Sequence, residues 1–336
     1  MEKIKISVPE KIYRLLQSDA KDFRILKPSG EVNLNAFINL LVVNFHEEFA
    51  ADDEMLRESI LGALSTLPEK YAKEAFSRVM SALAKREKAD EAEGKSIALS
   101  FKPTKASEGV TVYIENVLLK NESLSSFYRR MFLSYSQKLK NEREKIIHKQ
   151  NYQLLSTAAK KGIKVCLSLE QDTVMNDASV YAIAASKDEL FNYALFVCNK
   201  KNRTVRLAKI KTVSLLTQNA DISEEAEERF ARQIVAGAQY PIYSTDNQPI
   251  KVRLSAKGKG LFERIYLYRP TPVSVEGDVY TFDCSASQAL FYFQRFGDEA
   301  LILSPKRLGI SMLNFHHFAL KKYRSFYGKH YKLDES

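Results

Sequence analysis

The chain has 336 residues, of which 45% are hydrophobic and 27% charged, a composition typical of globular proteins and long enough for two or three domains. Its formal net charge of +10 favours polyanionic partners such as nucleic acid. No apolar run approaches a membrane span and the start lacks a signal peptide, so we expect a cytoplasmic protein without a membrane partner. Three widely separated cysteines are expected to be buried reduced thiols.

The first 50 residues show a strand–helix–helix pattern. Residues 3–8 alternate between apolar and polar side chains, which predicts a half-buried strand. Its polar side chains are those of Lys3, Lys5 and Ser7. A capping motif then opens a helix that we expect to reach about Lys21, and Asn33 or Asn35 caps a second helix.

A similar pattern recurs after residue 94. Ser96–Phe101 alternates like the first strand, and a helix is expected around Gly109–Leu119. The stretch ESLSSFYRRMFLSYSQKL then matches VNLNAFINLLVVNFHEEF of the first 50 residues in placing a polar cap, a leucine and a phenylalanine before a helix. We therefore predict a degenerate repeat, with helices between the copies and a charged helix over Lys138–Lys149 after them.

From Gly162 onward the pattern changes to strands, and the most basic of them is Asn199–Leu216, NKKNRTVRLAKIKTVSLL. It has six cations and no acid, set among branched apolar residues that favour β structure. The cations are Lys200, Lys201, Arg203, Arg206, Lys209 and Lys211. The apolar alternation slips at Ala208, and a bend or bulge there is expected to gather charges that a straight strand would scatter.

The C-terminal part has its own pattern. After a helix over residues 220–235, the expected elements from Ile250 to Ser304 follow the order βαββαβ, a ferredoxin-like arrangement, and a long helix closes the chain. The segment Lys306–Lys332 is basic, rich in aromatic residues and free of acids. It is long enough to reach a second copy, so we expect a homodimer formed through this part of the chain.

Catalytic and metal-binding motifs are missing from the sequence. It has no Cys-x-x-Cys, no His-Glu-x-x-His and no nucleophile elbow, and KGKG at Lys257–Gly260 lacks the third glycine of a phosphate loop. The adjacent His316 and His317 would point about 100° apart on a helix. We therefore expect a protein that is not an enzyme, with no catalytic residues and no metal or cofactor.

Three segments resemble known families. Asp177–Gln218 resembles a WYL domain, a small Sm-like β-barrel of bacterial regulators: Asn192-Tyr193-Ala194 keeps the tyrosine of its W-Y-L tripeptide, and RTVRLAKI from Arg203 keeps the charges of its basic last strand. FYFQRFGDEALILSPKRL resembles that family's C-terminal extension, and residues 1–50 resemble a ribbon-helix-helix domain. The combination is most similar to the WYL accessory proteins of type VI-D CRISPR systems.

The patterns and the resemblance together predict a multidomain α+β chain. The expected parts are a ribbon-helix-helix at 1–50, a helical linker at 51–94, a second strand–helix–helix unit at 95–150, the Sm-like barrel at 151–232 and the ferredoxin-like extension at 233–336. One ribbon strand alone leaves an unpaired edge. Its partner strand can come from a second chain or from Ser96–Phe101, and we favour the internal pairing.

The resemblance implies a non-catalytic protein that binds single-stranded RNA and modulates a type VI CRISPR effector nuclease. The alternative is a DNA-binding WYL-family transcriptional regulator, in which Lys3, Lys5 and Ser7 enter the major groove of duplex DNA. Under the RNA hypothesis, the basic segment holds phosphates, with Arg203 and Arg206 acting as planar clamps. Tyr193 then either stacks on a base or packs within the fold.

Overall fold

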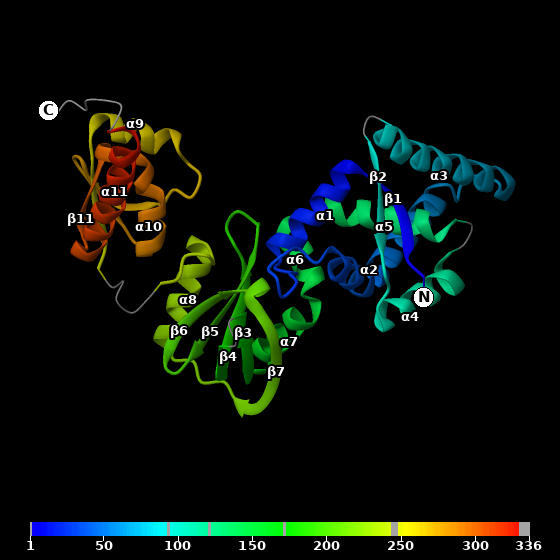
Figure 1. Ribbon diagram of the computed structural model, residues 1–336, viewed down its shortest axis with the longest axis horizontal. Helices are drawn as coiled ribbons and strands as arrows, with labels where there is room; N and C mark the ends of the chain where they lie inside the picture. Colours follow the sequence, from blue (N-terminus) through cyan, green and yellow to red (C-terminus); the bar gives the residue numbers. More distant parts are fainter. Residues whose placement is uncertain (1, 93–94, 120–121, 171–172, 243–247, 329–336) are drawn as a thin grey trace. The chain divides into compact units, whose positions relative to one another are not determined.

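The computed structural model describes residues 2–92, 95–119, 122–170, 173–242 and 248–328. The chain divides into two compact units, one made of Met1–Gln153 with Leu207–Lys211 and the other of Leu154–Arg206 with Thr212–Ser336 (Figure 1). Helices and three separate sheets occur among the described residues, which confirms the α+β class predicted from the sequence.

The first unit is built around a two-stranded ribbon. Strand β1 (Ile4–Pro9) pairs antiparallel with β2 (Ser96–Phe101), with Ile6 opposite Leu99. Alternate side chains of both strands, including Ile6 and Phe101, are buried against helices, because the strand period of two places them on one face. The predicted internal pairing of the ribbon is therefore confirmed.

Helices α1 (Glu10–Asp22), α2 (Leu34–Ala63) and α5 (Leu124–Gln137) pack against this ribbon. The other helices up to residue 161 are α3 (Glu69–Ala92), α4 (Lys105–Tyr113), the π-helix η1 (Ile114–Leu118), α6 (Lys140–Ile147) and α7 (Lys149–Lys161). The Asp19 carboxylate is buried among them, and it accepts hydrogen bonds from Arg143 Nε at 2.7 Å and from the Tyr135 hydroxyl at 3.0 Å. These partners compensate the loss of water around the charge.

Several predicted boundaries do not fall at breaks in the backbone. The limits at residues 50, 150 and 232 lie inside helices α2, α7 and α8 (Glu224–Ala236). Helix α2 continues past residue 50 because no glycine or proline interrupts its sequence before Gly62. The helix expected at Gly109–Leu119 starts earlier, at Lys105, where Thr104 caps it and accepts from the Ser107 backbone N–H.

A five-stranded sheet lies in the middle of the sequence. Its strands β3 (Ile163–Leu169), β4 (Val174–Ala185), β5 (Asn192–Cys198), β6 (Lys201–Arg206) and β7 (Ile210–Asn219) are arranged in the order β6-β5-β4-β3-β7. A short 3₁₀ helix, η3 (Leu207–Lys209), joins β6 to β7 and buries Leu207 and Ala208. The irregularity predicted at Ala208 is thus a 3₁₀ turn between strands on opposite edges of the sheet.

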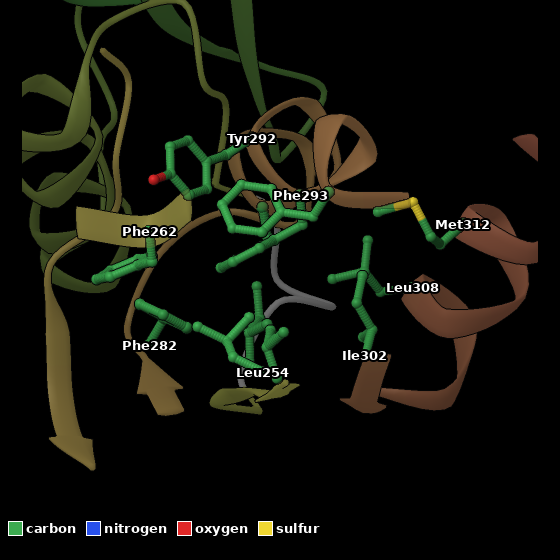
Figure 2. Packing of buried hydrophobic residues seen from close by; sticks show 12 residues of the cluster. Leu254, Phe262, Phe282, Tyr292, Phe293, Ile302, Leu308 and Met312 are labelled. Carbon is green, nitrogen blue, oxygen red and sulfur yellow. The ribbon is translucent and has the colours of Figure 1, made fainter. Parts of the chain in front are cut away.

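The C-terminal sheet has the order β11-β8-β10-β9. Its elements are β8 (Ile250–Leu254), α9 (Ala256–Arg264), β9 (Pro272–Glu276), β10 (Val279–Phe282), α10 (Ala286–Phe293), the 3₁₀ helix η4 (Gln294–Glu299), β11 (Ala300–Ser304) and α11 (Lys306–Tyr327). This succession confirms the predicted βαββαβ order and closing helix. Figure 2 shows the aromatic core between sheet and helices, with Phe262, Phe282 and Phe293 at its centre and Leu308 and Met312 reaching it from α11.

The three cysteines differ in burial. Cys198 is buried as predicted, but Cys166 and Cys284 are partly exposed, so the prediction is wrong for those two. The Cys166 thiol donates to Asn176 Oδ1 at 3.2 Å, a polar contact at a site that its apolar neighbours did not indicate.

Within the described ranges, no helix is long and apolar enough to cross a membrane.

Candidate nucleic-acid interface

The basic segment begins with a tight hairpin turn between β5 and β6. Cys198 pairs with Lys201, and the two residues between them, Asn199 and Lys200, have φ angles of 53° and 58°. Two consecutive left-handed residues form the hairpin turn that matches the twist of the strands, and asparagine adopts that conformation readily. The turn therefore holds Lys200 at the exposed tip of the hairpin, next to exposed Lys201.

The two arginines of β6 lie on opposite faces of the strand. Arg203 pairs with Phe196 and Arg206 pairs with Tyr193, with no register shift between β5 and β6. Because the strand period is two, residues three apart face opposite sides. Arg203 and Arg206 therefore do not present their guanidinium groups on the same face of β6.

Arg203 is exposed and shares its face of the sheet with Lys201. Together with Lys200, these side chains form what we call the hairpin cations: Lys200, Lys201 and Arg203. In the part of the chain that the structure describes, none of the three has an ion-pair partner. Burial raises the pKa of the neighbouring Cys198 thiol, while the charge of Arg203 acts in the opposite direction.

Arg206 is held by its own neighbours. Its guanidinium carbon lies 3.4 Å from the centroid of the Phe191 ring, a cation–π contact. Phe191 is itself fixed, because its backbone N–H donates to Ser186 Oγ at 3.2 Å. The side chain of Arg206 is partly buried, so this arginine is part of the fold on the face that helix α8 covers.

Tyr193 shares that covered face. It packs against the cluster formed by Leu195, Phe230 of α8 and Ala238, and it is only partly exposed. Of the two roles left open for Tyr193 by the sequence, the structure favours packing, since a ring enclosed on this face presents little surface to a base.

The contacts of Tyr268 with Asp188 and Tyr240 were not predicted from the sequence. The Tyr268 hydroxyl donates to Asp188 Oδ2 at 2.6 Å, and its ring lies 6.4 Å from that of Tyr240. The hydrogen bond to Asp188 raises the pKa of Tyr268 to about 12. Asp188 and Tyr268 are 80 residues apart in sequence, and neither sits in a recognisable motif, so no local pattern could have paired them.

The remaining cations of the basic segment belong elsewhere. Lys209 and Lys211 are exposed and belong to the first unit, where Asn151 Nδ2 donates to the Ile210 carbonyl at 2.8 Å. Lys209 and Lys211 therefore belong to a different unit from Lys200, Lys201, Arg203 and Arg206.

The ribbon of the first unit presents few cations. Lys3, Lys5 and Ser7 are exposed as predicted, but the strand paired with them places Ser100 opposite Lys5 and Ala98 opposite Ser7. The paired strands therefore present the predicted contact residues to a DNA groove only once, from the side of Lys3, Lys5 and Ser7.

Helix α11 is largely unpacked. Among the described residues, only Leu308 and Met312 of this helix are buried, whereas Leu313, Tyr323 and Phe326 are 65%, 66% and 71% exposed. Its cations are Lys306, Arg307, Lys321, Lys322 and Arg324. Residues 329–336, including Lys329 and Lys332 of the predicted basic segment, lie outside the described residues.

Across the ranges described, no group of three histidine, cysteine or acidic side chains is placed to hold a metal ion.

Comparisons with known proteins give a fold relationship. No protein-family model matches the chain, and no curated protein matches it. A crystal structure of a protein described as CRISPR Cas-related aligns with 96% of this chain and 94% of its own, at a TM-score of 0.66 and 15% identity. The proteasome accessory factor B/C (PafBC) of Arthrobacter aurescens aligns over 65% of this chain and 35% of its own at 15% identity, with a TM-score of only 0.27. The first alignment shows that this chain shares its fold with the CRISPR Cas-related protein.

Proposed function

We propose that the chain is a non-catalytic, single-stranded RNA-binding accessory protein that modulates an RNA-guided CRISPR nuclease of type VI. The observation that carries the proposal is the group of hairpin cations, exposed and without ion-pair partners among the described residues, in a chain of net charge +10. Uncompensated cations on a rigid hairpin bind phosphates with little reorganisation. The fold that this chain shares with a CRISPR Cas-related protein supports the proposal that the RNA binding serves a CRISPR system.

We also propose a domain type for each of three regions of the chain. We assign the five-stranded sheet to an Sm-like WYL barrel, because its strands, from Ile163 to Asn219, include the segment Asp177–Gln218 that resembles a WYL domain. The order β11-β8-β10-β9 with βαββαβ connectivity supports a ferredoxin-like C-terminal part. The ribbon and the helices beside it support a ribbon-helix-helix-like unit closed within one chain.

The accessory protein is also proposed to act as a homodimer through α11. A monomer would leave Leu313, Phe318, Tyr323 and Phe326 of this helix in water. Contiguous exposed apolar side chains of this kind mark association surfaces. Two copies would hold two sets of hairpin cations in one assembly, which raises RNA affinity through effective concentration.

Fluorescence anisotropy with equal lengths of single-stranded RNA, single-stranded DNA and duplex DNA at one salt concentration tests the proposal. We expect the tightest binding to single-stranded RNA, and a stimulated rate of target-RNA cleavage when the protein is added to a guide-loaded type VI effector. Preference for duplex DNA with no effect on the effector would instead support the DNA-binding regulator. Cleavage of RNA by the protein itself in the presence of divalent metal would contradict the non-catalytic role.

A further inference from the structure

A hollow of about 440 Å³ in the second unit lies apart from the hairpin cations. Its walls come from the loop between β4 and β5, from helix α8, from the segment before β9 and from the start of α10. Its polar lining includes Lys187, Arg232, Arg269, Thr271, Asp283 and Gln288. A hollow of this size is large enough for a small organic ligand.

The charged side chains of this hollow are three cations and one acid, which gives the lining a net charge of +2. Arg232 is engaged, because its Nη2 donates to Asp283 Oδ1. Lys187 is exposed and has no ion-pair partner among the described residues. Arg269 Nη1 donates to the Phe262 carbonyl at 3.1 Å, and its other guanidinium N–H groups have no acceptor in the described part of the chain. Lys187 and Arg269 are therefore available to an anion.

Hydrogen bonds next to these two cations fix the backbone that holds them. The Tyr268 hydroxyl donates to Asp188 Oδ2 at 2.6 Å. Each of these residues is next in sequence to one of the cations, so one hydrogen bond joins the segments that hold Lys187 and Arg269. Tyr268 has a φ of 64°, a conformation that is unfavourable for tyrosine and persists where contacts hold it. The Lys187 backbone N–H donates to Gln239 Oε1 at 3.1 Å. Groups fixed in this way bind a ligand with little loss of conformational freedom.

A buried amide on α10 adds a hydrogen-bond acceptor to the hollow. Gln288 is 2% exposed, and its Oε1 accepts no hydrogen bond from any described residue. A buried polar atom without a partner is unfavourable, so this oxygen points to a ligand group that supplies a donor. Gln288 lies in the first turn of α10, where the helix dipole is positive. The combination favours a ligand with an anionic group and, close to it, a hydroxyl or amino group.

The charge of the lining distinguishes between anionic groups. A phosphate monoester has a charge of about −1.5 to −2 at pH 7, which matches the net charge of the lining, whereas a carboxylate would leave part of it uncompensated. Two or three phosphate oxygens can also accept from the planar Arg269 guanidinium and from Lys187 together. Val235 and Pro270 of the lining are apolar and suit the carbon skeleton of such a ligand.

We infer that this hollow binds a phosphate monoester of a hydroxyl-bearing compound such as a sugar. Lys187 and Arg269 hold the phosphate, and Gln288 Oε1 accepts from a hydroxyl group. The same chemistry occurs in a free sugar phosphate and at the 5′ end of a phosphorylated RNA strand. The inference goes beyond the proposed function and does not depend on it, because the residues that line the hollow do not include the hairpin cations.

Isothermal titration calorimetry of the full-length protein with ribose 5-phosphate, ribose and inorganic phosphate tests this. We expect ribose 5-phosphate to bind and ribose, which has no phosphate, to give no measurable heat. Inorganic phosphate should bind roughly tenfold more weakly than ribose 5-phosphate, because it lacks the hydroxyl groups that donate to the amide.

Substitutions identify the side chains that hold the ligand. Lys187→Gln with Arg269→Gln should weaken ribose 5-phosphate binding roughly tenfold or more, the scale of lost hydrogen bonds to a charged group. Lys187→Gln alone changes an exposed side chain and gives a second measurement if the double variant loses its fold. Gln288→Leu should weaken binding of ribose 5-phosphate but not of inorganic phosphate. Lys251→Gln with Lys321→Gln removes the same charge from exposed positions of the same unit outside the hollow, and should bind like the wild type. Circular dichroism verifies that each variant keeps its fold.

A short RNA strand with a 5′-phosphate or a 5′-hydroxyl separates the two sources. Tighter binding of the phosphorylated strand, lost in the Lys187 and Arg269 double variant, assigns the hollow to an RNA end. Equal affinity for the two strands, with ribose 5-phosphate bound, assigns it to free phosphate esters.

Two results would overturn the inference. One is the absence of ribose 5-phosphate binding together with equal affinity for the two strands. The other is ligand binding that the Lys187 and Arg269 double variant leaves unchanged. Lys201→Ala with Arg203→Ala should keep its affinity for ribose 5-phosphate, so the hollow and the RNA-binding role of the hairpin cations can fail independently.

Discussion

Arg203 and Arg206 stand three residues apart on β6 and face opposite sides of the sheet, one exposed beside Lys201 and the other stacked on Phe191. Two arginines that look equivalent in the sequence therefore have different roles. The exposed one is placed to meet phosphate, and the stacked one holds the end of β6 to the loop before β5. This difference can be measured with single substitutions.

Replacing Lys201 and Arg203 by alanine should weaken single-stranded RNA binding and make its salt dependence shallower. Each lost phosphate contact changes the slope of log affinity against log salt by about 0.7, so the pair should change it by roughly 1.4. Arg14→Ala with Lys27→Ala removes the same charge from two exposed ion pairs, with Glu10 and Glu31, and should leave the slope unchanged. Equal effects of the two double variants would show that net charge alone determines binding.

Arg206→Ala should act on stability. Loss of the cation–π contact with Phe191 should lower the free energy of unfolding by about 1–2 kcal/mol, because the stacked guanidinium is partly desolvated. Urea unfolding followed by circular dichroism measures this, and RNA affinity under folding conditions should stay within about twofold of the wild type. A large loss of affinity with no loss of stability would place Arg206 at the RNA surface after all.

Tyr193→Ala should likewise destabilise the protein and leave RNA binding intact. Truncation of a fully buried aromatic side chain costs about 3–5 kcal/mol, and we expect roughly 1–3 kcal/mol here because Tyr193 is only partly buried. The measurement is thermal unfolding together with RNA anisotropy below the transition. If the ring stacks on a base, the variant will lose affinity at temperatures where it remains folded.

Raising the salt concentration should strengthen the homodimer while it weakens RNA binding. The α11 surface is apolar but carries five cations and no acid between Lys306 and Tyr327, so two copies repel one another until salt screens the charges. Sedimentation at several salt concentrations measures the dimer, and Phe318→Ser with Phe326→Ser should abolish it. Val273→Ser with Val275→Ser, exposed on strand β9 of the same unit, is the control. A dimer that weakens with salt would indicate an interface formed by ion pairs instead.

The sequence predicted the elements better than their contacts. Period-two alternation in Ile4–Val8 and Ser96–Phe101 was sufficient to predict both ribbon strands, because each had one apolar face to bury. The repeat favoured their pairing within one chain over pairing with a second chain, and the internal pairing is the one observed. The βαββαβ order was equally accessible, since turns and periodicity mark each element. The domain limits were not accessible from the sequence. Helices α2, α7 and α8 run through the predicted limits, and the sequence of a helix does not show locally where it leaves one core for another.

The candidate site was predicted as a list of charges but not as a surface. The exposure of Lys200, Lys201 and Arg203 agrees with prediction, whereas the facing of Arg206 depended on Phe191 and on the cover supplied by α8. Those contacts join residues that no local pattern connects. The exposure of Met55 and Leu56 was not predicted either, since the spacing of apolar residues in a helix does not by itself tell a buried side chain from an exposed one.

The Asp53 carboxylate should make the orientation of α2 sensitive to acid. Burial would raise the pKa of Asp53, but the hydrogen bonds and charges of Arg130 and Arg57 outweigh it and hold the pKa below its ordinary value. Because the pKa is lower in the folded state, this group contributes stability that is present above the unfolded pKa of about 3.9 and is lost as the pH falls through the folded value. Asp53→Asn should therefore lower the free energy of unfolding by about 1–3 kcal/mol at neutral pH. The difference from the wild type should shrink toward pH 3, which melting curves at several pH values would measure.

Glu69→Gln is the control for Asp53→Asn. It removes an exposed ion pair with Lys73 and should cost little stability, since such pairs contribute about 0–1 kcal/mol. A difference between Asp53→Asn and the wild type that stays constant down to low pH would mean that the carboxylate acts through its shape and not through its charge. In that case the face of α2 would be set by packing of Ile60 and its neighbours alone.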